Sequence, residues 1–385
     1  MQLKTKWPLK KLGELCEVKI GGTPARAISK YFSGDNLWVS ISEMNGETIT
    51  DTKEKITKEA TEKSNVKLIP KGTTLLSFKL SIGKTATAGK DLYTNEAIAG
   101  LIPKKDNILD SYLLHLFNSK LIDLENVGNK AFGKSLNSAY LRSEVKIPLP
   151  TIDIQQKIIN ECGKVDLEKE QTRKEINKAQ ESITTIVNES FSKYKTTKLS
   201  NISTLITKGS SPKWQGVKYI EGKGVLFVTS ENVREGFLDL TNKKYVETKF
   251  NDIQKKSILE KDDVLINIVG ASIGRAAIYN IEDIANINQA VALVRLKKNK
   301  VITKLLNVFL NSANIIESYN SMKKDVARAN LSLQNVSDLK IPLPSIIEQK
   351  SIMKKIDIQE AIIEKGNNVI RTIAERKQDV LKKYI

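Results

Sequence analysis

The pentapeptide Lys146-Ile147-Pro148-Leu149-Pro150 returns unchanged as Lys340-Ile341-Pro342-Leu343-Pro344. Each copy is followed by a glutamine, Gln155 or Gln349, and then by a long charged stretch. The copies stand 194 residues apart, about half of the 385-residue chain. A repeat of this size predicts two similar modules in one polypeptide, and hence a protein that engages a ligand or partner at two related places.

Further pairs of segments match in the same order, at an offset that drifts from 188 to 194 residues as short loop insertions would make it. They are Gly21-Gly22-Thr23-Pro24 with Gly209-Ser210-Ser211-Pro212, Ser42-Glu43 with Ser230-Glu231, Ser81-Ile82-Gly83-Lys84 with Ser272-Ile273-Gly274-Arg275, Asn95-Glu96-Ala97-Ile98-Ala99 with Asn288-Gln289-Ala290-Val291-Ala292, and Asn118-Ser119 with Asn311-Ser312. The duplication therefore extends over most of the chain.

The charged stretch after each pentapeptide has the seven-residue apolar period of a coiled coil. Pro150 and Pro344 precede the stretches, and Thr151 and Ser345 are placed to cap two helices. Each helix of roughly 40 residues would span about 60 Å, and the simplest pairing is antiparallel, as a ruler between the modules. The predicted seam contains Ile158, Cys162, Val165, Ile176 and Ile183 in the first helix and Ile352, Ile356, Ile363, Ile370 and Ile373 in the second.

The modules, at about 1–145 and 196–339, have the pattern of short strands between turn signals. We expect matching strands at 37–41 and 225–228 and at 74–78 and 264–268, with one helix per module near 109–118 and 302–311. The Gly-rich loops at 21–24 and 209–212 are interpreted either as phosphate-binding backbone or as ordinary hairpin turns. The fold class is α+β: two tandem strand-rich modules with a pseudo-twofold repeat, each followed by a long helix.

The net charge of +18 favours a polyanionic partner. Residues 151–198 carry +1 and residues 345–385 carry +3, which leaves +14 in the modules. A lysine-rich composition without a nucleic-acid partner is the alternative. No run of 18 apolar residues is present, and Cys16 and Cys162 are too few for a disulfide frame or a zinc site, so we expect a cytoplasmic protein with no membrane contact.

These doubled motifs resemble the DNA-specificity subunit of type I restriction–modification systems. The resemblance rests on the two modules that end in Lys-Ile-Pro-Leu-Pro and continue into a long helix, on Leu12-Gly13-Glu14-Leu15, on Trp38-Val39 and on the Ser-Ile-Gly-Lys/Arg turns. It implies target-recognition domains at 1–150 and 196–344, a central spacer helix at 151–195 and a C-terminal spacer helix at 345–385.

The resemblance also implies the partners. Each module would read one half of a bipartite double-stranded DNA target, and the helices would dock two adenine methyltransferase subunits and, through them, restriction–translocase subunits. S-adenosylmethionine would bind the methyltransferase, and ATP and Mg²⁺ the restriction subunit. This chain would bind no cofactor or metal and would catalyse nothing. It has no Asn/Asp-Pro-Pro-Tyr/Phe tetrapeptide, no Gly-x4-Gly-Lys-Ser/Thr phosphate loop and a single histidine, His115.

Base edges in the major groove are read by Arg, Lys, Asn, Gln, Ser and Thr side chains. The predicted DNA-binding residues are therefore loop residues of these types, together with two aromatic neighbours: Thr23, Arg26, Lys30, Tyr31, Ser42, Lys79, Lys84, Lys130 and Lys134 in the first module, and Ser211, Lys213, Trp214, Ser230, Asn232, Arg275, Lys323, Lys324 and Arg328 in the second.

Other classes of protein remain open at this point. The chain could be the recognition subunit of a related type II methyltransferase or nuclease system, or a non-enzymatic DNA-binding coiled-coil scaffold. A stand-alone DNA-binding protein would not need the heptad helices, and a pure coiled-coil scaffold would leave the positive charge of the modules without a role.

Overall fold

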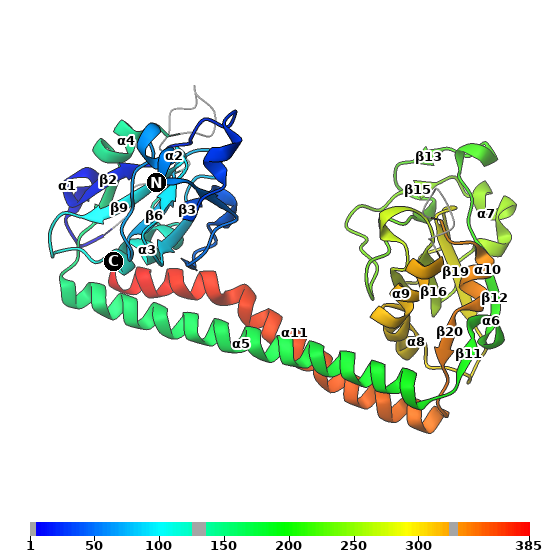
Figure 1. Cartoon of the computed structure of the whole chain (residues 1–385). Helices are drawn as coiled ribbons and strands as arrows, with labels where there is room; N and C mark the ends of the chain where they lie inside the picture. Colours follow the sequence, from blue (N-terminus) through cyan, green and yellow to red (C-terminus); the bar gives the residue numbers. More distant parts are fainter. Residues whose placement is uncertain (1–4, 125–135, 323–329) are drawn as a thin grey trace. The chain divides into compact units, whose positions relative to one another are not determined.

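The computed structural model describes residues 5–124, 136–322 and 330–385, and the chain divides into two compact units. Unit 1 is Met1–Arg173 with Asn367–Ile385, and unit 2 is Lys174–Gly366. The two long helices, α5 (Ile152–Lys193) and α11 (Ile346–Tyr384), each contribute one end to each unit (Figure 1). The predicted α+β fold, with a long helix after each module, is confirmed.

The first module consists of two small sheets and a strand pair. The main sheet has the order β2 (Cys16–Ile20), β9 (Ile98–Pro103), β6 (Thr74–Ser77), β7 (Thr85–Ala88), β4 (Thr48–Ile49). The second sheet has the order β5 (Glu54–Ile56), β3 (Asn36–Val39), β8 (Tyr93–Thr94), and the pair is β1 (Leu9–Lys11) with β10 (Lys146–Pro148). The helices are α1 (Leu12–Leu15), α2 (Lys58–Lys63), α3 (Asp110–Asn118) and α4 (Ser138–Ser143).

The second module also consists of two sheets and a strand pair, with different numbers of strands in the sheets. Its main sheet has the order β12 (Ser203–Lys208), β19 (Val291–Leu296), β16 (Asp263–Asn267), β17 (Ala276–Tyr279). The second sheet is β13 (Tyr219–Ile220), β15 (Tyr245–Val246), β14 (Val225–Val228), β18 (Ala285–Ile287), and β11 (Thr196–Lys198) pairs with β20 (Lys340–Pro342). The helices are α6 (Leu199–Ile202), α7 (Lys249–Ile253), α8 (Thr303–Leu310), α9 (Ala313–Met322) and α10 (Leu333–Asp338).

The repeated pentapeptide closes each module with a strand. Lys146–Pro148 pairs antiparallel with Leu9–Lys11, and Lys340–Pro342 pairs in the same register with Thr196–Lys198. Both strands place an isoleucine, Ile147 or Ile341, fully inside the core. The proline after each strand then stops the ladder and leads into the long helix, because proline lacks the N–H that a ladder needs.

The turns before the matching strands β6 and β16 show why the repeat tolerates substitution. Gly72 has φ +88°, and Asp262 at the equivalent place has φ +70°. Glycine enters this left-handed region freely, and Asp is one of the few other residues that enters it at modest cost. The two turns therefore keep one shape with different residues.

The ends of the long helices are part of the module cores. In unit 1, Ile158 and Cys162 of α5 and Leu381 of α11 belong to the same buried cluster as α3. In unit 2, Val187 of α5 and Ile352 of α11 belong to the cluster around α8. Each module is therefore fixed to the helix ends by apolar packing.

Ion pairs within unit 1 show the antiparallel direction directly. Glu161 of α5 pairs with Lys383 at 2.9 Å, and Glu168, seven residues later, pairs with Arg376, seven residues earlier. The numbers rise along one helix as they fall along the other, as antiparallel packing requires. The pairing that the apolar period predicts is therefore present.

The predicted seam residues differ in depth. Those fully buried are Ile158, Cys162, Val165, Ile352, Ile356 and Ile373, and those half-buried are Ile176, Ile183, Ile363 and Ile370. Thr172 and Gly366, which interrupt the apolar repeat, are also buried. Small residues at such places allow two helix backbones to come closer than isoleucine would.

Candidate nucleic-acid interface

Arg26 of the first module is held in one position by three side chains. Its guanidinium carbon lies 4.3 Å from the centre of the Phe32 ring and 4.9 Å from that of Trp38. The Arg26 Nη2 group donates to Glu54 Oε2 at 3.0 Å, and Nη1 donates to the other carboxylate oxygen. The hydrogen bond from Arg26 lowers the pKa of Glu54. The Arg26 side chain is nevertheless 53% exposed, so it is fixed and accessible at once.

Other predicted residues near this loop interact with carboxylates of the protein. Thr23 donates to Glu96, and this bond lowers the pKa of the Glu96 carboxyl, with the nearby Lys79 charge acting in the same direction. Lys30 pairs with Glu59 at 3.0 Å. Polyanion binding at this surface would therefore compete with carboxylates of the protein itself.

Three further predicted residues of the first module are placed quite differently from one another. Tyr31 is 7% exposed and belongs to the apolar cluster around Trp38, so its ring is not presented at the surface. Ser42 is exposed, with its hydroxyl 2.8 Å from that of Ser40. Lys84 is exposed at the start of β7.

The corresponding loop of the second module presents an aromatic ring. Trp214 lies on a short 3-10 turn, Lys213–Gln215, and is 74% exposed. The turn is closed by the Trp214 N–H, which donates to the Ser211 carbonyl at 3.1 Å, and Lys213 is exposed beside it. Ser211, Lys213 and Trp214 thus lie together on one loop.

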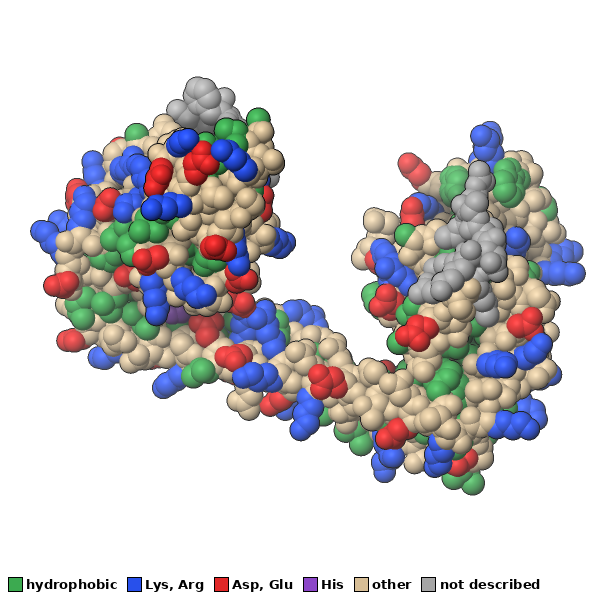
Figure 2. All heavy atoms as spheres, in the orientation of Figure 1, with side chains coloured by type: hydrophobic (Ala, Val, Ile, Leu, Met, Phe, Trp, Pro, Cys, Tyr) green, Lys and Arg blue, Asp and Glu red, His purple; other side chains and the backbone are tan. Residues whose placement is uncertain are grey.

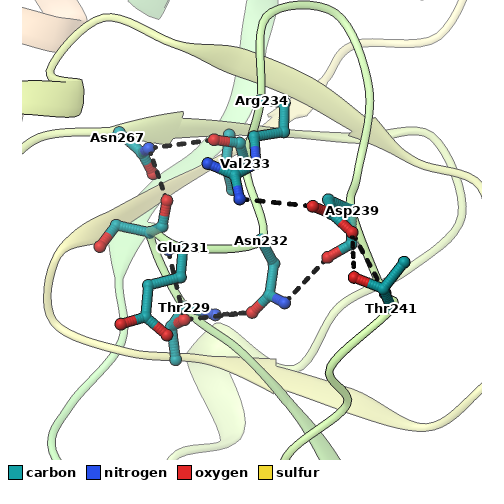
Figure 3. Close-up of polar contacts among 9 residues, drawn as sticks. Thr229, Glu231, Asn232, Val233, Arg234, Asp239, Thr241 and Asn267 are labelled. Atoms are coloured by element: carbon teal, nitrogen blue, oxygen red, sulfur yellow. Dashed lines mark hydrogen bonds and ion pairs between the residues drawn. The ribbon is translucent and has the colours of Figure 1, made fainter. Parts of the chain in front are cut away.

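Asn232, a predicted reader of bases, is a buried part of the loop that follows β14 (Figure 3). Its Oδ1 accepts from the Thr229 N–H at 2.9 Å and from the Thr229 hydroxyl at 3.1 Å, and its Nδ2 donates to the Asp239 carbonyl at 3.0 Å. Asp239 in turn accepts from Arg234 at 3.3 Å. With 7% exposure, the Asn232 side chain is directed at the protein backbone rather than at a ligand.

Asn267 at the end of β16 reinforces the same loop. Its Nδ2 donates to the Ser230 carbonyl at 3.0 Å and to the Val233 carbonyl at 3.3 Å, and its side chain is fully buried (Figure 3). Ser230 is half-buried and contributes its carbonyl to this network. Arg275 pairs with Glu235 at 3.6 Å on the adjacent surface.

The first module builds the equivalent loop with a different residue. Ser40 N–H donates to Glu43 Oε2 at 2.8 Å, as Thr229 N–H donates to Asn232 Oδ1. Ser40 thus corresponds to Thr229 and Glu43 to Asn232, an offset of 189 residues. The sequence match of Ser42-Glu43 with Ser230-Glu231 is therefore one residue out of register. The same two residue types recur in both loops, but one position away from the residues that make the shared hydrogen bond.

Five predicted residues, Lys130, Lys134, Lys323, Lys324 and Arg328, lie outside the described residues. Of the described ones, sequence reasoning missed Glu54, which fixes Arg26 from a neighbouring strand. Figure 2 shows Lys and Arg side chains interspersed with Asp and Glu on both modules, so the positive charge on this face is divided into small groups.

In the parts of the chain that the structure covers, no group of three or more His, Cys, Asp or Glu side chains is placed to hold a metal ion. Cys16 and Cys162 are both buried and unpaired, and burial raises their pKa values to about 12 and about 11, which keeps the thiols protonated. Over the same residues, no helix is both long and apolar enough to cross a membrane.

A family model described as type I restriction modification DNA specificity domain matches residues 4–181 and, a second time, residues 191–372. The chain is thus a protein built from two DNA specificity domains. It belongs to the type I restriction–modification DNA specificity family.

Two relatives illustrate the match in sequence. The chain is 34% identical over 157 residues to the type I restriction enzyme MjaIX specificity subunit of Methanocaldococcus jannaschii, which covers 40% of this chain and 36% of that protein. It is 32% identical over 165 residues to the EcoR124I/EcoR124II specificity subunit of Escherichia coli, covering 41% and 40%. The matched segments therefore span about two fifths or less of the length of these relatives.

Solved structures share the fold over the whole chain. A chain from a structure of complex assembly and conformational transition in a type I R-M system matches with a TM-score of 0.64 and 17% identity, covering 100% of this chain and 98% of that one. The type I S subunit from M. genitalium matches with a TM-score of 0.53 and 15% identity over 100% and 98% of the two chains.

Proposed function

We propose that this chain is the DNA-recognition subunit of a type I restriction–modification complex and that it reads a bipartite double-stranded target, one half-site with each module. The observation that carries the proposal is the doubled scaffold with divergent loops. A hydrogen bond that shapes the loop after β3 recurs after β14. The exposed loop residues differ, with Arg26 in the first module and Lys213 and Trp214 in the second. One frame with two different surfaces is what two unlike half-sites require.

The long helices would dock two adenine methyltransferase subunits and, through them, restriction subunits. The match to a chain from a structure of type I complex assembly supports this proposal. The chemistry would reside in the partners: S-adenosylmethionine in the methyltransferase, ATP and Mg²⁺ in the restriction subunit. The present chain would contribute binding energy and position only.

Methylation mapping tests the proposal. Co-expression with the cognate methyltransferase subunit should give a stable complex of two methyltransferases and one copy of this chain, measurable by native mass spectrometry. Sequencing that detects methylated adenines should then reveal a motif of two specified blocks separated by an unspecified spacer. A single contiguous motif would instead favour a related type II system, and no motif at all would contradict the proposal.

A salt series separates specific recognition from plain charge attraction. Affinity that depends on neutralised phosphates falls steeply as salt rises, whereas base discrimination is measured as a ratio between sequences at one salt concentration. The complex should protect one sequence in a footprint, and the free chain should bind DNA weakly. Equal affinity for all sequences in the presence of the methyltransferase would favour a non-specific DNA-binding scaffold.

A further inference from the structure

An equivalent glycine begins the loop that carries Arg26 in the first module and the loop that carries Trp214 in the second. Gly21 lies so close to the backbone of Asn95 that a Cβ atom would come within 2.3 Å of its carbonyl oxygen, and Gly209 stands in the same relation to Asn288, at 2.8 Å. No side chain fits at either place, so the glycines are equivalent fixed points of the scaffold. Five residues after Gly21 comes Arg26, and five residues after Gly209 comes Trp214.

The neighbouring strand gives a second, independent correspondence. In β5, Glu54 lies opposite Trp38 of β3. Lys244, directly before β15, continues this pairing: its carbonyl accepts from the Phe227 N–H of β14 at 2.8 Å. Glu54 therefore corresponds to Lys244. The partner that fixes Arg26 is replaced by a residue of opposite charge in the module that lacks the arginine.

The core beneath these exposed residues is built around an aromatic residue in both modules. Trp38 shares a buried cluster with the small Ala60, whereas Phe227 packs edge to face against Phe250 with ring centres 5.4 Å apart. A large residue beside a small one in the first module is replaced by two medium ones in the second. An aromatic residue of the central strand is therefore kept, while the residues at the corresponding exposed positions change from Arg26 and Glu54 to Trp214 and Lys244. Lys244 pairs with Glu231 at 2.8 Å.

Stability does not explain the exposed pair. An ion pair with side chains 53% and 39% exposed contributes at most about 1 kcal/mol, and an indole that is 74% exposed buries little apolar area. Both residues are instead presented to solvent on short, closed loops. The chemistry that differs between the modules is thus the chemistry that a ligand meets.

We propose that Arg26 and Trp214 are equivalent specificity-determining positions, at which the first module reads a guanine and the second contacts a thymine. The proposal rests on the proposed function. Glu54 uses one hydrogen on each terminal nitrogen of Arg26, which leaves three of five donors for the O6 and N7 acceptors of guanine. Trp214 offers an apolar surface, and the C5-methyl group of thymine is the apolar feature of the major groove.

Glu54 has the role of a positioning residue in this scheme. It holds the guanidinium plane against Phe32 and Trp38, so that little side-chain entropy is lost when a base is bound. Lysine at position 26 would keep the positive charge but lose the planar, two-pronged donor set. Charge and base readout can therefore be separated by one conservative substitution.

The experiment is the methylated motif of the complex of full-length chain and methyltransferase, measured for Arg26→Ala, Arg26→Lys, Glu54→Gln and Trp214→Ala. Lys55→Ala, in the same strand as Glu54 and at a lysine that pairs with Asp51 at 2.9 Å, is the matched control. Arg26→Ala and Arg26→Lys should both lower the preference for guanine at one position of one half-site by roughly 5- to 100-fold. Glu54→Gln should lower it partly at that same position, Trp214→Ala should relax one position of the other half-site, and Lys55→Ala should leave the motif unchanged.

Three outcomes would overturn the inference. Methylation that weakens equally on all sequences after Arg26→Ala, and recovers with Arg26→Lys, would reassign Arg26 to a phosphate. An unchanged motif for both Arg26→Ala and Trp214→Ala would remove both positions from base readout. Loss of complex with all variants, Arg26→Lys included, would make the loop structural. A wild-type complex without a bipartite motif would instead refute the proposed function.

Discussion

Gln155 and Leu109 are joined by a hydrogen bond: the Oε1 atom of the buried Gln155, on the first turns of α5, accepts from the Leu109 N–H that opens α3, at 2.9 Å. The Gln155 Nε2 group donates to the Pro150 and Asn107 carbonyls, both at 2.9 Å. Gln349 repeats the arrangement, with Ile302 N–H at 2.8 Å. The glutamine after each pentapeptide is therefore the joint between module and helix.

We expect Gln155→Leu to destabilise unit 1 by about 2–4 kcal/mol, because a fully buried side chain with three hydrogen bonds is lost and three backbone groups are left without partners. Gln156→Leu is the control, since Gln156 is exposed and bonds only to Asn160; it should change stability by about 0.5 kcal/mol or less. Thermal unfolding monitored by circular dichroism measures both. Equal effects of the two variants on the unfolding temperature would show that Gln155 does not join the module to the helix.

His115 should make unit 1 less stable in acid. It is buried in α3 with Nδ1 unpaired, and burial, aided by the charge of Lys377 and opposed by that of Asp166, lowers its pKa to about 4. The unfolded chain takes up a proton as the pH falls through about 6.5, and the folded chain does so only near 4. Stability present above pH 6.5 is therefore lost as the pH falls from 6.5 to 4, by on the order of 3 kcal/mol in total.

Because His115 is the only histidine in the chain, its ring gives a single NMR signal, whose midpoint should lie near pH 4. His115→Leu, which places an apolar residue where the second module has Val308, should remove this part of the pH dependence while the carboxylates still titrate. A midpoint near 6.5 would show that the imidazole is solvated.

Asn232→Ala should destabilise unit 2 by about 1–3 kcal/mol, because it leaves the Thr229 N–H and the Asp239 carbonyl without their partner. Asn242→Ala, at an exposed residue nearby, should be almost neutral. Chemical denaturation compares the two. A changed half-site for the Asn232 variant at unchanged stability would show that Asn232 reaches the DNA after all.

Strands, helices and the doubled architecture were predictable from sequence because they follow from periodicity and from local turn residues, as at Gly72 and Asp262. Side-chain contacts between distant segments of one module were not. Arg26 and Glu54 are 28 residues apart and meet only because β5 pairs with β3. Tyr31 looked like a loop residue, but its short 3-10 turn directs the ring into the core. Asn232 is of a residue type that can read bases, but its side chain is buried and has a structural role.

A complete heptad inserted after Ile176 of α5, matched by a second after Ile370 of α11, tests whether the helices set the DNA spacer. Seven residues add two turns, about 10 Å of helix, which corresponds to roughly three base pairs of axial rise. Because the seven-residue period is kept, the seam should remain in phase and the complex should still form. The methylated motif should keep both half-sites while its unspecified spacer grows by one to three base pairs, about the amount that the added helix allows. Two inserted residues at the same places should break the phase and lower the unfolding temperature instead. If half-site sequences change while the spacer length does not, the helices do not set the distance.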